Sequence, residues 1–132
     1  MVTVREYDGL PVVTVDFAHR GAKLTLNNVV VDTGAAISVF KTDDMEQIGI
    51  VPEPFDVLDS RRGVGGSERV IEKTVDEISV GELTLGDFDF DMSSMHYADD
   101  IDGLLGYDFL KAVEAVVDFG RMQILGGVDG ST

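Results

Sequence analysis

The sequence of 132 residues contains no cysteine and no tryptophan, and only 3 prolines and 2 histidines. Without cysteine the chain has no disulfides, no thiol catalysis and no cysteine-based zinc site, and the redox compartment is left open. The histidines, His19 and His96, lie 77 positions apart with no clustered partner at metal-ligand spacing. The sequence therefore indicates no metal site, and we expect each histidine to be a surface or loop residue.

Basic residues are also scarce, since 10 lysines and arginines stand against 25 aspartates and glutamates, a net charge of -15. This charge argues against binding to nucleic-acid phosphates and to anionic membrane surfaces. No apolar run reaches the ~18 residues that a membrane-spanning helix needs. Residues 1–6 lack the pattern of a signal peptide. The sequence thus predicts no membrane segment and a cytoplasmic location, unless a leader or an anchor lies outside it.

The length is that of one domain, and most of its segments read as strands. Residues 12–17 and 22–26 are rich in β-branched side chains, and residues 19–21 separate them as the turn of a hairpin would. We expect Asn27 and Asn28 to mark a second turn. The composition of these segments predicts a predominantly β protein.

Two short helices are expected among the strands. Thr42 has the side chain of an N-cap, and the helix that follows it is expected to end at Gly49. Residues 107–113 are predicted to form the second helix, with a strand at residues 115–117 soon after it. Residues 68–77 alternate without a uniformly apolar face, which is typical of an exposed hairpin arm.

The segment with the most specific chemistry is Asp32, Thr33 and Gly34, which follows the apolar residues 29–31 and precedes the mainly apolar residues 35–40. Aspartate catalysis needs a carboxylate on a tight turn at the end of a buried strand, and glycine lets a second backbone approach it closely. The alternative is an ordinary turn held by an Asx hydrogen bond.

Two further segments extend this motif into a family resemblance. Leu104, Leu105 and Gly106 form an apolar pair and a glycine before the second predicted helix, and the glycine-rich residues 61–68 lie between the two motifs. In this order the three elements resemble those of retropepsin-like aspartic proteases, the single-domain relatives of pepsin that include the retroviral proteases. In that family the glycine-rich segment is a flap, a hairpin that closes over bound substrate. The likeness spans residues 32–110 and, through the flanking strands, most of the chain.

The resemblance implies an all-β fold, mainly antiparallel and closed into a barrel-like acid-protease domain with one or two short helices, equivalent to half of a pepsin-like bilobal enzyme. It implies a single domain over residues 1–132, with the flap at about residues 61–74 and dimerisation strands at about residues 115–126. The implied activity is that of an aspartic endopeptidase acting on a peptide or protein substrate, with no cofactor and no metal.

The chain carries only one Asp-Thr/Ser-Gly, whereas pepsin-like enzymes use two catalytic aspartates. The other candidates are unsuitable, because residues 102–103 lack the Thr or Ser, residues 118–120 have Phe119 in the middle position, and residues 129–131 lie in a polar tail. An active protease must therefore be a homodimer in which each chain supplies its Asp32 across a two-fold axis.

The resemblance also assigns roles to particular residues. Asp32 would activate water, Thr33 would hydrogen-bond across the two-fold axis, and Gly34 would offer backbone contacts to substrate. Ala36 and Tyr107 stand where retroviral members carry charged residues of a salt-bridge network, so the dimer must be supported differently, by Tyr107 or by a sheet of terminal strands. The residues implied in substrate binding are Ala35, Val64, Gly65, Gly66, Leu104 and Leu105.

Three features admit a second interpretation. Asp87, Asp89 and Asp91 alternate as at the start of a calcium loop, but the positions that need Gly and Glu hold Met92 and Ala98, so the solvated face of a strand is expected. Arg61 and Arg62, beside the flap glycines, have two interpretations: their positive charge either favours acidic substrates or neutralises nearby carboxylates. The whole chain is either the protease or a catalytically silent module that keeps the fold for peptide binding or dimerisation.

The acidic composition leads to a prediction about assembly. A homodimer would carry twice the charge of one chain, that is -30, and this self-repulsion opposes association. We therefore expect dimerisation to tighten with added salt or lower pH. Sedimentation at low and high ionic strength measures the effect, and equal dimer affinity under both conditions would contradict it.

Overall fold

Strands dominate the computed structural model, which describes residues 1–63, 66–94 and 100–127. Within these residues the two helices are α1 (Thr42–Glu46) and α2 (Tyr107–Ala112). The strands are β1 (Val2–Thr3), β2 (Arg5–Tyr7), β3 (Leu10–His19), β4 (Ala22–Val31), β5 (Val39–Lys41), β6 (Leu58–Gly63), β7 (Gly66–Val80), β8 (Leu83–Ser93), β9 (Gly103–Leu105), β10 (Ala115–Asp118) and β11 (Gln123–Gly126).

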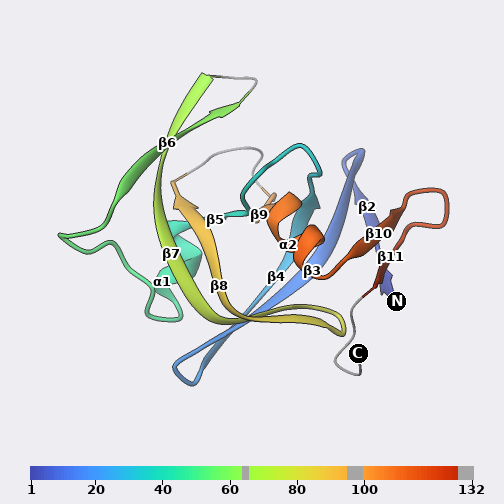
Figure 1. Cartoon of the computed structure of the whole chain (residues 1–132), viewed down its shortest axis with the longest axis horizontal. Helices are drawn as coiled ribbons and strands as arrows, with labels where there is room; N and C mark the ends of the chain where they lie inside the picture. Colours follow the sequence, from blue (N-terminus) through green and yellow to red (C-terminus); the bar gives the residue numbers. More distant parts are fainter. Residues whose placement is uncertain (64–65, 95–99, 128–132) are drawn as a thin grey trace.

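Six strands close into a barrel in the order β3-β4-β9-β5-β8-β7, and β7 completes the ring by pairing with β3 (Figure 1). Most neighbours are antiparallel, but β9 runs parallel to β4 and β5 runs parallel to β8. Strand β2 extends the sheet beside β3, β6 extends it beside β7, and β1, β11 and β10 form a separate sheet. The predicted all-β, mainly antiparallel, closed barrel with two short helices is confirmed.

The first long hairpin joins β3 to β4 through Arg20 and Gly21, as the sequence predicts. These residues have φ values of 48° and 86°, the left-handed conformation that a tight hairpin turn requires. The second turn predicted at Asn27 and Asn28 is wrong, because β4 continues through both residues. The register with β3 shifts at this point, so the pair lies in a β-bulge, where the backbone is irregular without reversing direction.

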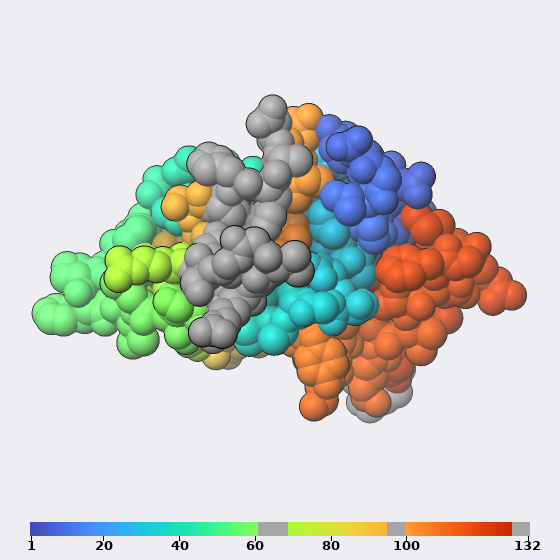
Figure 2. Space-filling view, turned by 90° about the horizontal axis from the view of Figure 1, so that it is seen from above, coloured from blue at the N-terminus to red at the C-terminus, as the bar shows by residue number. Residues whose placement is uncertain are grey.

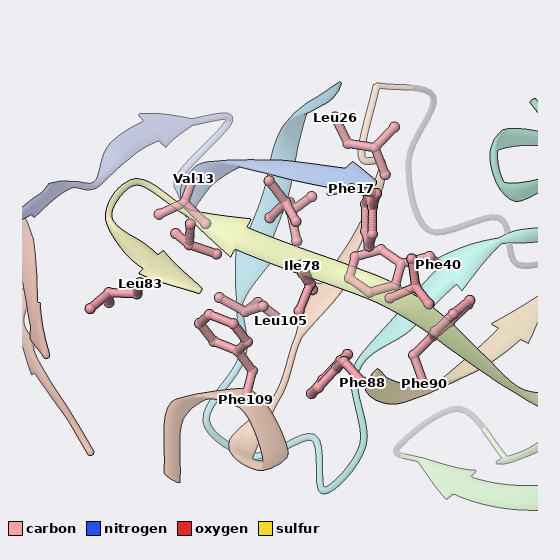
Figure 3. Close-up of a cluster of buried hydrophobic side chains, with 14 of the residues drawn as sticks. Val13, Phe17, Leu26, Phe40, Ile78, Leu83, Phe88, Phe90, Leu105 and Phe109 are labelled. Atoms are coloured by element: carbon pink, nitrogen blue, oxygen red, sulfur yellow. The ribbon is translucent and has the colours of Figure 1, made fainter. Parts of the chain in front are cut away.

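Phenylalanine rings fill the barrel interior (Figure 3). Phe40 meets Phe17 and Phe90 edge to face, with ring centroids 4.8 Å and 5.7 Å away. Phe109 on α2 meets Phe88 on β8 in the same way at 5.9 Å. Such pairs contribute about 0.5–1.5 kcal/mol beyond the area that they bury, so the rings hold β5 to β3 and β8 across the barrel interior and hold α2 to β8.

Two polar side chains are buried where the sequence predicted exposure. His19 is 9% exposed, because its Nδ1 accepts a hydrogen bond of 3.2 Å from the backbone N–H of Asp76, where β7 packs against β3. Asp91 is fully buried rather than solvated, because β8 lies between β5 and β7 at this residue. Asp87 and Asp89 on the same strand are exposed, as predicted. The second histidine, His96, lies outside the described residues.

Both predicted helices are present, but the first one starts at its predicted cap residue and ends at Glu46 rather than at Gly49. Helix α1 begins at Thr42 itself, and Lys41, still in extended conformation at the end of β5, occupies the N-cap position without a side-chain capping bond. The chain turns on to Gly49, whose φ of +82° permits the reversal that follows the helix. Helix α2 and strand β10 lie where residues 107–113 and 115–117 were predicted to form them.

Strand β7 is both the arm of a protruding hairpin and a wall of the barrel. The sequence predicted an exposed arm, and Glu72 and Thr74 are exposed. Val75 and Ile78 are buried, however, because the 15-residue strand continues into the barrel and pairs there with β3 and β8, and Val70 is buried on the arm itself. The exposed-arm prediction therefore holds for only part of the strand.

The insertion of β9 between β4 and β5 joins the two ends of the Asp-Thr-Gly segment. Residues 29–31 of β4 pair with residues 103–105 of β9, which pairs on its other side with residues 39–40 of β5. The fit is close at Gly103, where a Cβ would lie 2.6 Å from the carbonyl oxygen of Val39 and 2.7 Å from the ring of Phe40. Only glycine can occupy this position without displacing β5.

We predict that Gly103→Ala destabilises the fold by about 1–3 kcal/mol, the usual effect of overpacking a core, because backbone rather than a flexible side chain blocks the added methyl. Gly86→Ala is the matched control, since a Cβ there would find its nearest atom 3.8 Å away. Urea unfolding of both variants measures the difference. Equal free energies of unfolding for the two variants would disprove the close fit.

Candidate functional site

The Asp-Thr-Gly segment begins a loop at the end of β4 that residues 32–38 form. Its first turn is fixed by hydrogen bonds at both ends of Asp32: the Asp32 N–H donates to the Leu105 carbonyl oxygen (2.9 Å), and the Ala35 N–H donates to the Asp32 carbonyl oxygen (3.1 Å). The Gly34 N–H donates to Oδ1 of Asp32 (3.0 Å), the Asx bond expected of such a turn. The Asp32 carboxylate is therefore oriented by its own loop.

The loop opens to one face of the molecule. Asp32 is half-buried, whereas Thr33 and Gly34 are exposed. In Figure 2 the cyan part of the chain, which includes this loop, lies at the surface between the blue N-terminal strands and the orange and red C-terminal part. A buried strand thus ends in a carboxylate that remains accessible from outside.

The second sequence motif packs directly against this loop. A Cβ at Gly106 would lie 2.7 Å from the carbonyl oxygen of Ala35, and the Tyr107 N–H donates to the same oxygen at 2.7 Å. Glycine is required because the two backbones touch at this point. The structure therefore brings together the two motifs, which are about 70 positions apart in the sequence.

The two leucines of that motif have different surroundings. Leu104 is half-buried and packs against a small cluster of Val12, Val30 and Ile101. Leu105 is fully buried in the main core, so its side chain offers no surface to a substrate, whereas its carbonyl oxygen holds the Asp32 N–H. Of this pair, only the side chain of Leu104 reaches toward the surface.

Two residues that complete the loop, Ser38 and Asp108, were not identified from the sequence. Ser38 is fully buried, and its N–H and hydroxyl both donate to the carboxylate of Asp108, at 3.0 Å and 2.7 Å. The Ser38 hydroxyl in turn accepts a hydrogen bond of 2.8 Å from the Gly106 N–H. Their signal in the sequence is a serine and an aspartate, each within an apolar run.

The β6–β7 hairpin corresponds to the glycine-rich segment and projects from the barrel (Figure 1). Gly63 pairs with Gly66, while Val64 and Gly65 and the side chains of Arg61 and Arg62 lie outside the described part of the chain. The backbone of the hairpin is therefore described as far as the pair of Gly63 and Gly66.

An ion-pair cluster holds the base of this hairpin. Lys73 Nζ lies 2.8 Å from Oδ1 of Asp56 and 2.9 Å from Oε1 of Glu53, and its side chain is only 10% exposed. Burial lowers the pKa of Lys73, but the hydrogen bonds and charges of the two carboxylates raise it overall above its usual value. The hydrogen bond from Lys73 also holds the pKa of Asp56 below its usual range. The cluster fastens the segment before β6 to β7.

Among the described residues, no group of three or more His, Cys, Asp or Glu side chains is arranged to hold a metal ion. Over the same residues, neither helix is both long and apolar enough to cross a membrane. A model of a protein family described as aspartyl protease matches residues 13–109, which include both loop motifs and the β6–β7 hairpin. A search of curated proteins finds no match.

A pair of carboxylates near α1 is unfavourable at neutral pH. Burial, and then the negative charge of Asp102, raise the pKa of Asp44 above its usual value. Asp102 is held against β4, since its Oδ2 accepts a hydrogen bond of 3.0 Å from the Asn28 N–H. Because the folded-state pKa of Asp44 is raised, its contribution to stability is fully present below the usual pKa and is lost as pH rises through the folded value.

We therefore predict that Asp44→Asn raises the melting temperature by roughly 1–3 °C at pH 7, with the gain disappearing in acid where the carboxylate is protonated in both states. Glu46→Gln is the control, because Glu46 is exposed on the same helix and its charge is not among the causes that raise the pKa of Asp44. Calorimetry across this pH range measures both variants. A gain that is the same at every pH would show that the carboxylate charge is not its cause.

Proposed function

The chain belongs to the aspartyl protease family, and from this premise we propose that it is an aspartic endopeptidase in which a homodimer brings two copies of Asp32 together. The single observation that carries the proposal is the fixed but accessible carboxylate of Asp32 at the end of a buried strand. The dimer follows from the one Asp-Thr-Gly in the sequence.

The surface near the loop supports association with a second copy. Thr33 and Gly34 are exposed beside the carboxylate. Large apolar side chains are exposed on α2 and on the C-terminal hairpin, where burial by a partner would be favourable: Tyr107, Val116, Phe119 and Leu125. Strand β10 is also an edge of its three-stranded sheet, so it can accept a further strand.

Two carboxylates a few ångströms apart cannot both ionise at little cost, so the Asp32 pair would share one proton and titrate as a unit. The ionised carboxylate takes a proton from a bound water, whose oxygen attacks the peptide carbonyl carbon. The protonated carboxylate donates to the developing oxyanion. Transfer of a proton to the amide nitrogen then allows the C–N bond to break, and no covalent acyl intermediate forms.

The substrate would bind as an extended strand between the Asp32 loop and the β6–β7 hairpin. Gly34 and Ala35 would offer backbone contacts on one side of the substrate, and the hairpin, whose last described pair is Gly63–Gly66, would close over the other side and exclude water. Leu104 is the apolar side chain of the site that reaches toward the surface. This arrangement favours peptide over small-molecule substrates.

The test is cleavage of unfolded casein by the wild type and by Asp32→Asn, across acid to neutral pH at high salt. We expect the substitution to reduce the rate at least ~100-fold, the lower bound for loss of general acid–base catalysis. At low protein concentration the wild-type rate should rise with the square of concentration, because two chains form one site. Asp43→Asn, an exposed carboxylate on α1, should cleave like the wild type.

The outcomes separate the protease from the silent module. Cleavage that survives in Asp32→Asn would contradict the proposal. A wild type that sediments as a dimer but cleaves neither casein nor a diverse peptide library would favour a module that binds peptides or only dimerises.

A further inference from the structure

The Asp32 loop is attached to the protein at three points along its length. At its start, the Asp32 N–H donates to Leu105, and in its middle the Ala35 carbonyl accepts from the Tyr107 N–H. At its end, Ser38 donates twice to the Asp108 carboxylate. All three partners belong to the continuous segment of β9 and α2, so this one segment holds the loop at its start, middle and end.

The third attachment uses charge-assisted hydrogen bonds inside the protein. Oδ2 of Asp108 accepts from the Ser38 N–H at 3.0 Å, and Oδ1 accepts from the Ser38 hydroxyl at 2.7 Å and from the Phe109 N–H at 2.8 Å. The Ser38 hydroxyl accepts from the Gly106 N–H at 2.8 Å. Hydrogen bonds to an ionised group are about twice as strong as neutral ones.

The middle of the loop has little other support. Thr33, Gly34 and Ala36 are exposed, so burial of their side chains does not hold them in place. Ser38 is fully buried and also accepts, through its carbonyl oxygen, a hydrogen bond of 2.9 Å from the Asp91 N–H on β8. Ser38 is therefore the residue where the exposed loop becomes part of the rigid barrel.

We propose that Ser38 and Asp108 are positioning residues for the Asp32 carboxylate, a role that rests on the proposed function. Neither touches the substrate. They fix the end of the loop against α2, so that each Asp32 meets its counterpart in one orientation. A displacement of about 1 Å in a catalytic group can reduce turnover ~100-fold, so a loosened loop is expected to affect kcat far more than KM.

Two single variants and their combination test the role. Ser38→Ala removes the hydroxyl but keeps the backbone bond to Asp108. Asp108→Asn keeps the shape of the side chain but replaces one of the two oxygens that accept from Ser38 with an NH2 group. A hydrogen-bond donor then faces a donor of Ser38. We expect each to reduce kcat about 10–100-fold with KM changed less than about threefold, and the double variant to lose little more than the worse single one, because both break the same attachment.

The control is Asp16→Asn, a carboxylate on β3 that likewise accepts a hydroxyl, from Thr25 at 2.5 Å, outside both the Asp32 loop and the proposed dimer surface. It should keep the wild-type kcat. All rates are measured well below each variant's melting temperature, so that a purely structural role would leave kcat unchanged. Wild-type kcat in both folded single variants would overturn the inference.

The failure of this inference differs from the failure of the proposed function. A wild type without cleavage refutes the protease, whereas an active wild type, an inactive Asp32→Asn and fully active Ser38→Ala and Asp108→Asn refute only the positioning role. Should the variants not fold, amide hydrogen exchange of the wild type carries the test. The Ser38 and Gly106 amides should exchange only through global unfolding, and rapid exchange of both would overturn the inference.

Discussion

The position of β9 between β4 and β5 is the constraint on which the rest of the structure depends. The strands that flank the Asp32 loop are not hydrogen-bonded to each other; both pair with β9 instead. Their separation is therefore that of two strand spacings, and Gly103 is the residue that permits this spacing beside Val39 and Phe40. The loop spans a gap whose width is set by a strand from the far end of the sequence.

This arrangement explains how an exposed loop can be rigid. Burial stabilises most elements of the barrel, but a carboxylate that, under the proposed function, meets substrate and a second chain cannot be covered by its own chain. The loop instead relies on backbone hydrogen bonds to β9 and α2, such as that between Asp32 and Leu105. Orientation is thus established when the protein folds, and little reorganisation remains for binding or reaction.

The sequence predicted what is encoded locally. The Asp-Thr-Gly turn, the Leu-Leu-Gly segment and the alternating strands each carry their signal within a few residues, and the closed barrel was implied by the family resemblance that their order carries. The bond between Ser38 and Asp108 joins residues 70 positions apart, so no periodicity reveals it. His19 was assigned to the surface because no metal-ligand partner lies near it in the sequence, and Asp91 was assigned to solvent by alternation, but both side chains are buried. At Asn27 and Asn28, turn and bulge call for similar residues, and only pairing distinguishes them.

Contacts with the barrel and with an ion-pair cluster also fix part of the β6–β7 hairpin. From Glu77 to Ser79, β7 pairs with β3 on one side and β8 on the other, so this half of the strand cannot move without opening the barrel. Nearer the tip, Lys73 binds Glu53 and Asp56 and fastens the strand to the segment before β6. Residues 71–72 still pair with β8, so closure over a substrate, which the proposed function requires, is left to the part of the hairpin beyond Ile71. The barrel that orients Asp32 also fixes the base of the hairpin from which the proposed closure would take place.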